Sequence, residues 1–459
     1  MEIYHFRSVD SAIYEIRDHT LHFASPKEVN DPIDGYAGIY WQGDCAAWEG
    51  LLRNYVCSLY HAIDLYRLAA NQNTLLNECV LADIHCFDEL PLGNVLKEVG
   101  DKFLQLSNIR IVIERYGTGD RACYAKELKT ILNFVHRSAM RVCLQDMYAR
   151  GLFSNEEYEG IYPVKSDHEE QIWTLSEELD SNQAEKIFGL MGEIADDSYE
   201  IGQIRIALKE KPEDRMNPDS GETDCPMRQK WLGIYVDFPA IYIRQLQNMI
   251  FPQGYITCFS AKNDDSVMWG NYAERHRGVC LVYEPQEQDN RQIIPIKQHG
   301  RYMQYEVRKM EYDGTPILRN FFDSLGCLTG RALRGWLTGT NEISIYHAKY
   351  YDNDQWRTDY WHANDEKFFH KLREWEYECE YRILITDMLG AYKDFKEKDR
   401  NFEFEPSVLT GIIFGAETTV QDKIRIIGAM QAAGKNYKLF QAEYDDKMQK
   451  IAVRPKHYL

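Results

Sequence analysis

The sequence lacks the roughly 18-residue apolar run that a membrane-spanning helix requires. Its start, MEIYHFRSVD, has neither the basic stretch nor the apolar core of a signal peptide. The eleven Cys residues are scattered, and no two stand at the spacing of a zinc knuckle or a redox motif. We therefore expect a reduced, cytoplasmic protein that has no transmembrane segment and no metal site.

Positive charge is also scarce. The chain has 53 Lys and Arg against 72 Asp and Glu, which gives a formal net charge of −19. Such a chain repels a polyanion at long range, so non-specific nucleic-acid binding is disfavoured. The sequence contains no Gly-rich phosphate-binding loop and no nucleophile elbow.

What is present indicates a large folded protein. The chain has 459 residues, enough for about two to three domains, and 44% of them are hydrophobic. Disorder over the whole chain is therefore not expected. The 31 Tyr and 9 Trp residues are typical of a folded chain with aromatic-lined pockets.

The hydrophobic patterns differ between the ends and the middle of the chain. Residues 1–43 predict a strand, a helix, a second strand and a turn, and strand patterns return from about residue 250. Residues 44–249 carry apolar positions at helical spacing and contain a polar, proline-containing loop at 209–226. We expect an α+β fold in which residues 1–43 and 250–459 build a mixed β-sheet core and residues 44–249 form a large, all-helical insertion.

The first candidate segment is the strand over Tyr4–Arg7, which we expect near the edge of the sheet. His5 and Arg7 there are suited to binding the hydroxyls or phosphates of a ligand. A surface strand with alternating polar residues explains the same pattern.

The second candidate segment is YITCFSAKNDDSVMWGNYAERHRGVCLVYE, residues 255–284. A strand ends at Ser260, a short helix carries Met268, Trp269 and Tyr272, and a buried strand follows. This density of aromatic and small polar side chains suits a pocket wall, and a packed strand-helix-strand corner would look alike.

The third candidate segment is KLREWEYECEYR, residues 371–382. Its period of two predicts a strand with Glu376, Glu378 and Glu380 on one face beside Arg382. One of these carboxylates could orient a sugar hydroxyl or accept a proton. A solvated strand face is the alternative.

Together these segments resemble the bacterial domain of unknown function 2971 family. LHFASPKEVNDPIDG, CFSAKNDDSVMWGNYAERHRGVCLVYE, KLREWEYECEYRI and LTGIIFG match its motifs in order, over about half of the chain. Asn271 stands where the family usually has His, His5 where Lys is frequent, and the helical block is unusually long. The family name implies no activity.

A looser similarity links the same segments to ADP-ribosyltransferase-like folds. The resemblance implies that NAD is the substrate, that His5 holds the nicotinamide ribose and that Tyr272 stacks on the nicotinamide ring. It further implies that Glu378 or Glu380 stabilises the oxocarbenium-like transition state. The residues expected to contact NAD are Arg7, Ser25, Ser260, Trp269 and Arg382.

We therefore expect an ADP-ribosyltransferase or NAD glycohydrolase of the kind found among bacterial toxins and phage-defence effectors. The helical insertion would bind a macromolecular acceptor or a protein partner. Two alternatives stay open from the sequence. One is a non-catalytic sensor or scaffold, and the other is a metal-dependent nuclease built from Asp31, Asp34, Lys371, Glu378 and Glu380.

Overall fold

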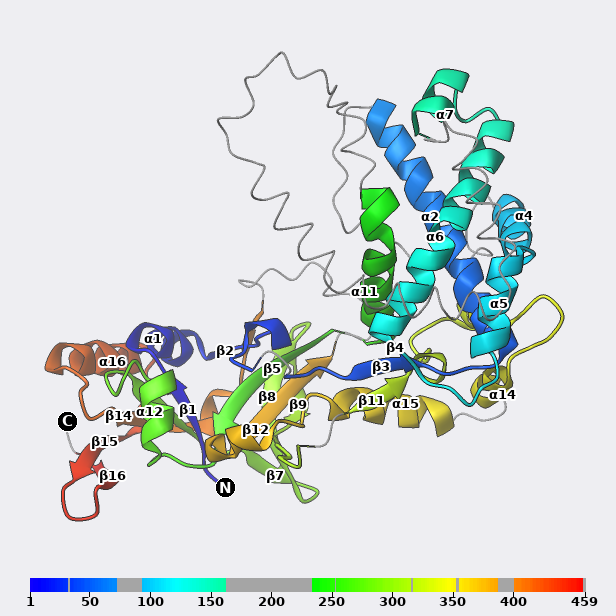
Figure 1. The fold of residues 1–459 in the computed structure, drawn as a ribbon. Helices are drawn as coiled ribbons and strands as arrows, with labels where there is room; N and C mark the ends of the chain where they lie inside the picture. The colour runs from blue at the N-terminus through cyan, green and yellow to red at the C-terminus, as the bar shows by residue number, and fades with distance from the viewer. Residues whose placement is uncertain are drawn as a thin grey trace. The chain divides into compact units, whose positions relative to one another are not determined.

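A computed structural model of the chain describes residues 1–31, 34–71, 93–161, 233–251, 253–314, 317–351, 355–386 and 400–456. It divides into two compact units (Figure 1). The first unit comprises Met1–Ala37, Pro252–Ile317 and Trp361–Leu459, and the second comprises Gly38–Phe251 and Leu318–Tyr360.

The first unit is built on an eight-stranded mixed sheet with the strand order β10-β12-β5-β1-β6-β14-β15-β16. Neighbouring strands are antiparallel except for β14 and β15, which are parallel. The strands are β1 (Ile3–Arg7), β5 (Gly254–Ser260), β6 (Val279–Tyr283), β10 (Arg308–Lys309), β12 (Glu380–Thr386), β14 (Leu409–Phe414), β15 (Lys438–Asp445) and β16 (Lys450–Pro455). Two smaller sheets pair β2 (Thr20–His22) with β13 (Asn401–Glu403) and β8 (Arg291–Gln298) with β7 (Gln286–Gln288) and β9 (Arg301–Glu306).

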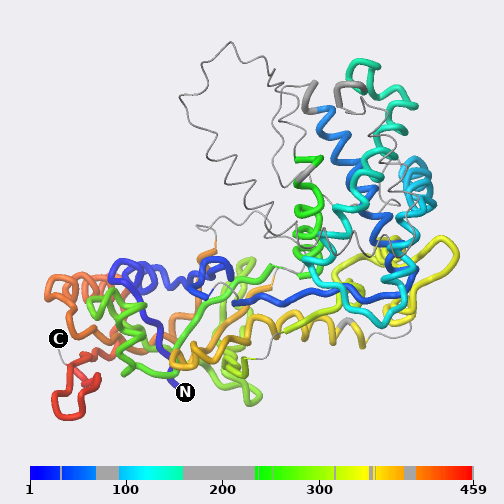
Figure 2. Tube along the Cα trace, viewed as in Figure 1, coloured from blue at the N-terminus to red at the C-terminus, as the bar shows by residue number. Residues whose placement is uncertain are grey.

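Helices cover both faces of the large sheet. On one face, α1 (Val9–Asp18) and α16 (Val420–Ala432) place Ile16 and Ile426 in the main apolar core. On the other face, α12 (Ser266–Tyr272) packs Met268 and Trp269 against Phe6 of β1. The tube in Figure 2 shows that blue, green and orange-to-red segments meet in this unit. Both ends of the chain therefore build the core, as the sequence predicts.

Local side chains explain where these helices begin. Ser8 caps α1 by accepting a hydrogen bond from the Ser11 backbone, and Asp265 caps α12 in the same way. A further short 3-10 helix, η1 (Pro26–Glu28), has a capping box between Ser25 and Glu28.

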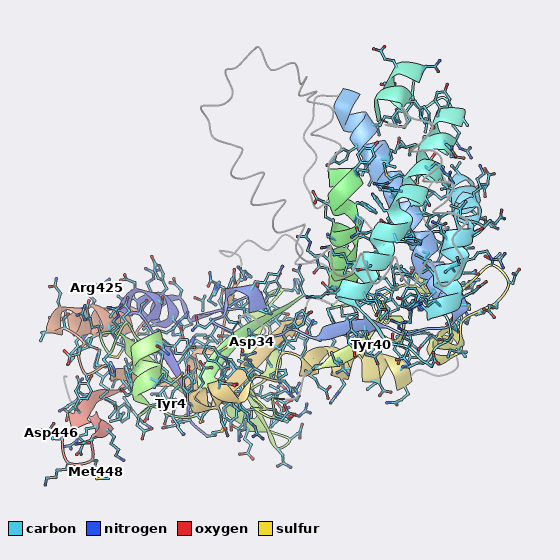
Figure 3. All side chains as sticks on the ribbon, in the orientation of Figure 1. Tyr4, Asp34, Tyr40, Arg425, Asp446 and Met448 are labelled. Carbon is cyan, nitrogen blue, oxygen red and sulfur yellow. The ribbon has the colours of Figure 1, made fainter. Side chains whose placement is uncertain are left out.

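Figure 3 shows the side chains of the first unit. Tyr4 and Asp34 are labelled there, as are Arg425 on α16 and Met448 between β15 and β16.

The strand β1 lies inside the sheet and not at its edge, which corrects the sequence-based prediction. It pairs along its whole length with β6, but with β5 it pairs only at Tyr4 and Ser260. The other end of β5 pairs with Ala24 through two hydrogen bonds to Ile256. The two strands therefore separate beyond Tyr4, and this separation positions the site described below.

The second unit is mostly helical, but it is not all-helical as predicted. Its helices are α2 (Cys45–Asn71), α4 (Gly93–Leu104), α5 (Ser107–Tyr116), α6 (Ala125–Ala149), α7 (Asn155–Ile161), α11 (Phe238–Ile250), α13 (Gly330–Leu337), α14 (Ile345–Tyr351) and α15 (Gln355–Glu366), the second half of which belongs to the first unit. A small sheet in the order β11 (Leu318–Asn320), β3 (Gly38–Trp41) and β4 (Cys123–Tyr124) completes it.

The boundaries of the helical unit also differ from the predicted insertion. Residues 318–360 belong to the helical unit although they follow several strands of the sheet unit. Their apolar side chains, such as Phe321 and Trp336, are buried and pack edge-to-face against each other. The predicted loop at 209–226 lies outside the described residues. Within the described helices, none is long and apolar enough to cross a membrane.

Candidate functional site

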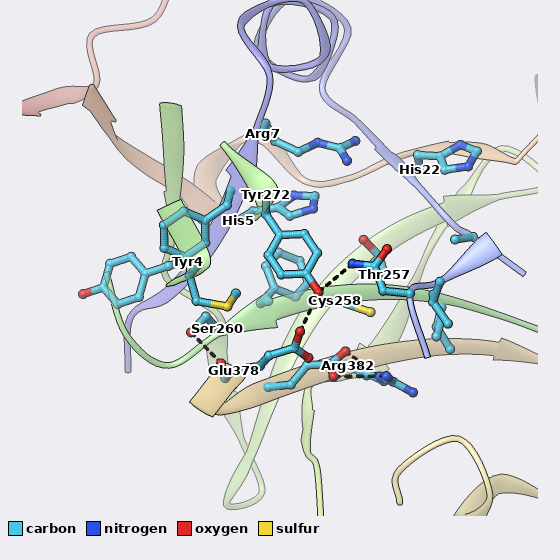
Figure 4. A pocket seen from close by; sticks show the side chains of 18 of the residues that line it. Tyr4, His5, Arg7, His22, Thr257, Cys258, Ser260, Tyr272, Glu378 and Arg382 are labelled. Atoms are coloured by element: carbon cyan, nitrogen blue, oxygen red, sulfur yellow. Dashed lines mark hydrogen bonds and ion pairs between the residues drawn. The ribbon is translucent and has the colours of Figure 1, made fainter. Parts of the chain in front are cut away.

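The separation of β1 and β5 opens a cavity of about 340 Å³ in the first unit (Figure 4). A volume of this size suits a small ligand or one part of a larger one. The lining residues come from β1, β5, α12, the segment after β2 and the region around η6 (Arg373–Glu378) and β12. They include Tyr4, His5, Arg7, His22, Asn30, Cys258, Ser260, Met268, Tyr272, Lys371, Glu378, Glu380 and Arg382.

Glu378 and Tyr272 meet in this cavity from opposite walls. The Tyr272 hydroxyl donates to Glu378 Oε1 at 2.5 Å and accepts from Asn30 Nδ2 at 3.0 Å. Burial and the Glu378 carboxylate both raise the pKa of Tyr272, so the phenol stays protonated at neutral pH. Lys371 Nζ donates to the other oxygen, Glu378 Oε2, at 2.6 Å. Because a carboxylate accepts about four hydrogen bonds, Glu378 keeps acceptor sites for a ligand.

Glu380 lies in a different environment, a buried network of ion pairs. Arg382 donates to Glu380 Oε1 at 2.6 Å and to Asp34 Oδ1 at 2.6 Å, and it is fully buried. Lys371 Nζ lies 3.3 Å from Glu380 Oε2. Burial alone would raise the pKa of Glu380, but Arg382 and Lys371 hold it at about 2. Both oxygens of Glu380 are therefore held by cations, which is the arrangement of a structural carboxylate.

The region around these carboxylates is not the continuous strand that the sequence predicts. Residues Arg373–Glu378 form a 3-10 helix, Cys379 has a left-handed backbone with φ 42°, and β12 begins only at Glu380. Glu376, Glu378 and Glu380 therefore do not share a strand face, and Glu376 is exposed. A tight turn at Cys379, and not a continuous strand, directs both Glu378 and Glu380 inward.

His5 and Arg7 reach the cavity from β1 and share one buried partner, Glu15 of α1. His5 Nδ1 lies 2.9 Å from Glu15 Oε1, and Arg7 Nε donates to Glu15 Oε2 at 3.0 Å. Burial lowers the pKa of His5. Burial alone would raise the pKa of Glu15, but His5 and Arg7 bring it to about 2. Arg7 is partly exposed, and within the described residues its terminal nitrogens make no hydrogen bond.

A second cavity, of about 550 Å³, lies over α1 in the same unit. Its lining includes Tyr14, Asp18 and Asn401, and it shares Arg7 and His22 with the first cavity. The two cavities therefore meet at an arginine whose terminal nitrogens remain for a ligand.

The remaining predicted site residues have different surroundings. Ser260 lines the cavity and its hydroxyl donates to the Glu378 carbonyl at 2.7 Å, which fixes the backbone of the glutamate. Ser25 caps η1 and does not line the cavity. Trp269 is fully buried, packs edge-on against Phe6 at 5.0 Å and does not line the cavity either. Arg382 lines the cavity but is engaged by Glu380 and Asp34.

Glu15 is a site residue that the sequence motifs do not predict. A signal for it exists, because Ala12 and Ile16 mark the buried face of α1 and Glu15 stands three residues after Ala12. A carboxylate on the apolar face of a helix needs buried partners. Asn30, which positions Tyr272, and His22 were also missed, although both lie in the quoted segment LHFASPKEVNDPIDG and Asn30 belongs to its NDP core.

The carboxylates proposed for a nuclease partly converge. Asp34, Glu378 and Glu380 all contact Lys371 within 3.8 Å, whereas Asp31 is buried in the turn that leads to Asp34. Arg382 and Lys371 neutralise this cluster. Across the described part of the chain, no group of three or more His, Cys, Asp or Glu side chains is arranged to hold a metal ion.

Comparison of the chain with protein-family models, with curated proteins and with solved structures finds no match. The two resemblances drawn from the sequence motifs therefore stay predictions.

Proposed function

We propose that the first unit is an ADP-ribosyltransferase-like enzyme that cleaves the nicotinamide–ribose bond of NAD. The ADP-ribose would pass to a macromolecular acceptor or to water, as in a bacterial toxin or phage-defence effector. The observation that carries the proposal is that His5, Tyr272 and Glu378 line one cavity. The first and last of these residues, His5 and Glu378, are 373 positions apart in the sequence, and the chain order of histidine, tyrosine and glutamate is the order that the resemblance implies.

Each of the three residues has a role suited to this reaction. Tyr272 lines the cavity, where its ring would stack on a planar nicotinamide. Glu378 brings a carboxylate to the same place, where it would accept a ribose hydroxyl and stabilise positive charge on the ribose as nicotinamide leaves. His5 would hold the ribose from β1.

The size of the site supports a dinucleotide in preference to nicotinamide alone. Nicotinamide and its ribose would occupy the cavity between β1 and β5, and the adenosine half would occupy the second cavity. Arg7 and His22, which line both, then lie where the pyrophosphate passes. An arginine with two terminal nitrogens available suits phosphate oxygens.

A metal-dependent nuclease is the second candidate, and the convergence of Asp34, Glu378 and Glu380 is the observation in its favour. Two divalent cations would have to displace the guanidinium of Arg382, which is fully buried and paired with two carboxylates. Breaking such a buried pair costs about 3–5 kcal/mol. The NAD reaction requires no such rearrangement, so we favour it.

The test is to identify the products formed from NAD by the purified protein. Adenine-labelled NAD is incubated with the full chain alone and with cell lysate, and the products are separated by chromatography and mass. Free nicotinamide with ADP-ribose would indicate hydrolysis, and label on macromolecules would indicate transfer. Absence of both, together with no NAD binding by calorimetry, would contradict the proposal. Cleavage of DNA or RNA that depends on Mg²⁺ or Mn²⁺ and stops in chelator would favour the nuclease.

A further inference from the structure

Glu15 is a buried carboxylate that connects two cavity-lining residues of β1. It is 1% exposed, lies 2.9 Å from His5 Nδ1, and accepts hydrogen bonds from Arg7 Nε and the Tyr283 hydroxyl. His5 and Arg7 line the first cavity and Glu15 itself borders the second, whereas Tyr283 is fully buried and lies outside the lining of both cavities. Removing an ionised carboxylate from water is costly unless the carboxylate is well paired, and at Glu15 three polar groups supply this pairing.

The geometry fixes where the proton of the His5 ring must be. Burial lowers the pKa of His5, so the ring is neutral near pH 7 and carries one proton. An ionised carboxylate only accepts hydrogen bonds, so this proton is on Nδ1, 2.9 Å from Glu15. The opposite nitrogen, Nε2, then holds a lone pair, and within the described residues it makes no hydrogen bond.

We propose that Glu15 is a positioning residue that holds His5 as the Nδ1–H tautomer and fixes the orientation of Arg7. Nε2 of His5 is then an obligatory acceptor, matched to a ribose hydroxyl and not to a carbonyl or phosphate oxygen. The terminal nitrogens of Arg7 remain available for an anionic group. The involvement of this arrangement in NAD cleavage rests on the proposed function, but the tautomer itself does not.

The wild-type protein provides the first test without any substitution at Glu15. Long-range ¹H–¹⁵N correlation spectra of protein labelled at histidine distinguish the two tautomers, and the His5 signals are assigned by their loss in His5→Asn. We expect a protonated Nδ1 and an unprotonated Nε2 at pH 7.5. A protonated Nε2 in the wild type would overturn the proposal.

The substitution Glu15→Gln makes a sharper prediction. Arg7 cannot give up its proton, so it retains the amide oxygen, and the amide NH₂ group turns to His5. The imidazole can exchange tautomers, and we expect His5 to switch to the Nε2–H form. The control is Tyr283→Phe, which removes a hydrogen bond to the same carboxylate but leaves its charge, and which should keep the Nδ1–H form. Retention of the Nδ1–H tautomer in folded Glu15→Gln, as judged by circular dichroism, would contradict the proposal.

Kinetics separate this inference from the proposed function. If the wild type cleaves NAD, Glu15→Gln should raise KM and lower kcat/KM by about tenfold or more, whereas Tyr283→Phe should stay within about threefold. A tautomer switch with unchanged kinetics would refute a positioning role in catalysis. If the wild type does not cleave NAD, the proposed function fails while the tautomer measurement still decides the role of Glu15.

Discussion

Two glutamates that stand two positions apart share Lys371 but otherwise have different partners in this structure. Glu378 contacts the hydroxyl of Tyr272 and the ammonium of Lys371 at the cavity wall, whereas Glu380 is held on both oxygens by Arg382. The sequence identified both as candidates and could not rank them, because their difference comes from a left-handed residue between them, Cys379. The partners make Glu378 the candidate for catalysis and Glu380 a support of the fold.

Substitutions at Tyr272 separate the contribution of its hydroxyl to NAD cleavage from that of its ring. Tyr272→Phe keeps the ring and removes the hydroxyl that contacts Glu378, and it should lower kcat/KM for NAD by about tenfold, the value of one charge-assisted hydrogen bond. Tyr272→Ala also removes the stacking surface, so we expect about a further tenfold loss. Tyr302→Ala, at an exposed tyrosine of β9, serves as the control. Equal activities of the Phe and Ala variants would show that the ring does not stack on the substrate.

At the scale of elements, the cavity exists because β1 and β5 are paired at one end and separate at the other. The sequence predicted both strands, since each carries a clear apolar pattern, but it placed β1 near the sheet edge. A strand's position in a sheet depends on contacts far apart in sequence, such as the five-residue pairing of β1 with β6, and no local pattern encodes them. The turn around Cys379 was missed because its polar alternation imitates a strand.

Substitution of two glycines tests how closely the backbone of β1 packs against its neighbours. A Cβ on Gly278 would lie 2.2 Å from the Arg7 carbonyl oxygen, whereas a Cβ on Gly270 in α12 meets no atom within 4 Å. Gly278→Ala must displace the end of β1, and we expect it to lower the free energy of unfolding by about 1–3 kcal/mol. Gly270→Ala should raise it by about 0.5–1 kcal/mol, because alanine favours the helix.

Urea denaturation followed by circular dichroism measures both effects. Equal stabilities of the two variants would contradict the tight contact between Gly278 and β1. NAD turnover by Gly278→Ala should also fall, since Arg7 and His5 lie on the displaced strand.

At the scale of the molecule, the chain folds into a sheet unit and a mainly helical unit. The sequence predicted the α+β composition and the helical middle because the hydrophobic period changes along the chain. It did not predict that residues 318–360 join the helical unit or that this unit contains strands, since these segments are short and lie among strands of the other unit.

The helical unit contains a histidine that makes its stability depend on pH. His136 accepts from the Tyr55 hydroxyl at 2.7 Å and donates to the Ile234 carbonyl at 2.8 Å, so both ring nitrogens are satisfied in the neutral form. Burial lowers its pKa from 6.5 to about 4. The unfolded chain therefore binds a proton at higher pH than the folded one, and stability falls as the pH drops from about 6.5 towards about 4.

The loss from His136 should reach about 2 kcal/mol at pH 5. We expect His136→Gln, whose amide can still donate to Ile234, to lose less stability than the wild type between pH 7.5 and pH 5. Thermal or urea unfolding at the two pH values measures the difference. Parallel losses in the wild type and the variant would contradict this assignment.

In the proposed reaction, Glu378 is the carboxylate that stabilises the transition state of NAD cleavage. The most direct measurement is the initial rate of nicotinamide release by the wild type, by Glu378→Gln and by Glu376→Gln, an exposed glutamate two positions earlier in the same 3-10 helix. We predict a loss of about 100-fold or more for Glu378→Gln, the scale of a lost electrostatic contact in the transition state. Glu376→Gln should stay within about twofold of the wild type, as expected for a surface substitution. A folded Glu378→Gln variant that releases nicotinamide at the wild-type rate would rule out this role of Glu378.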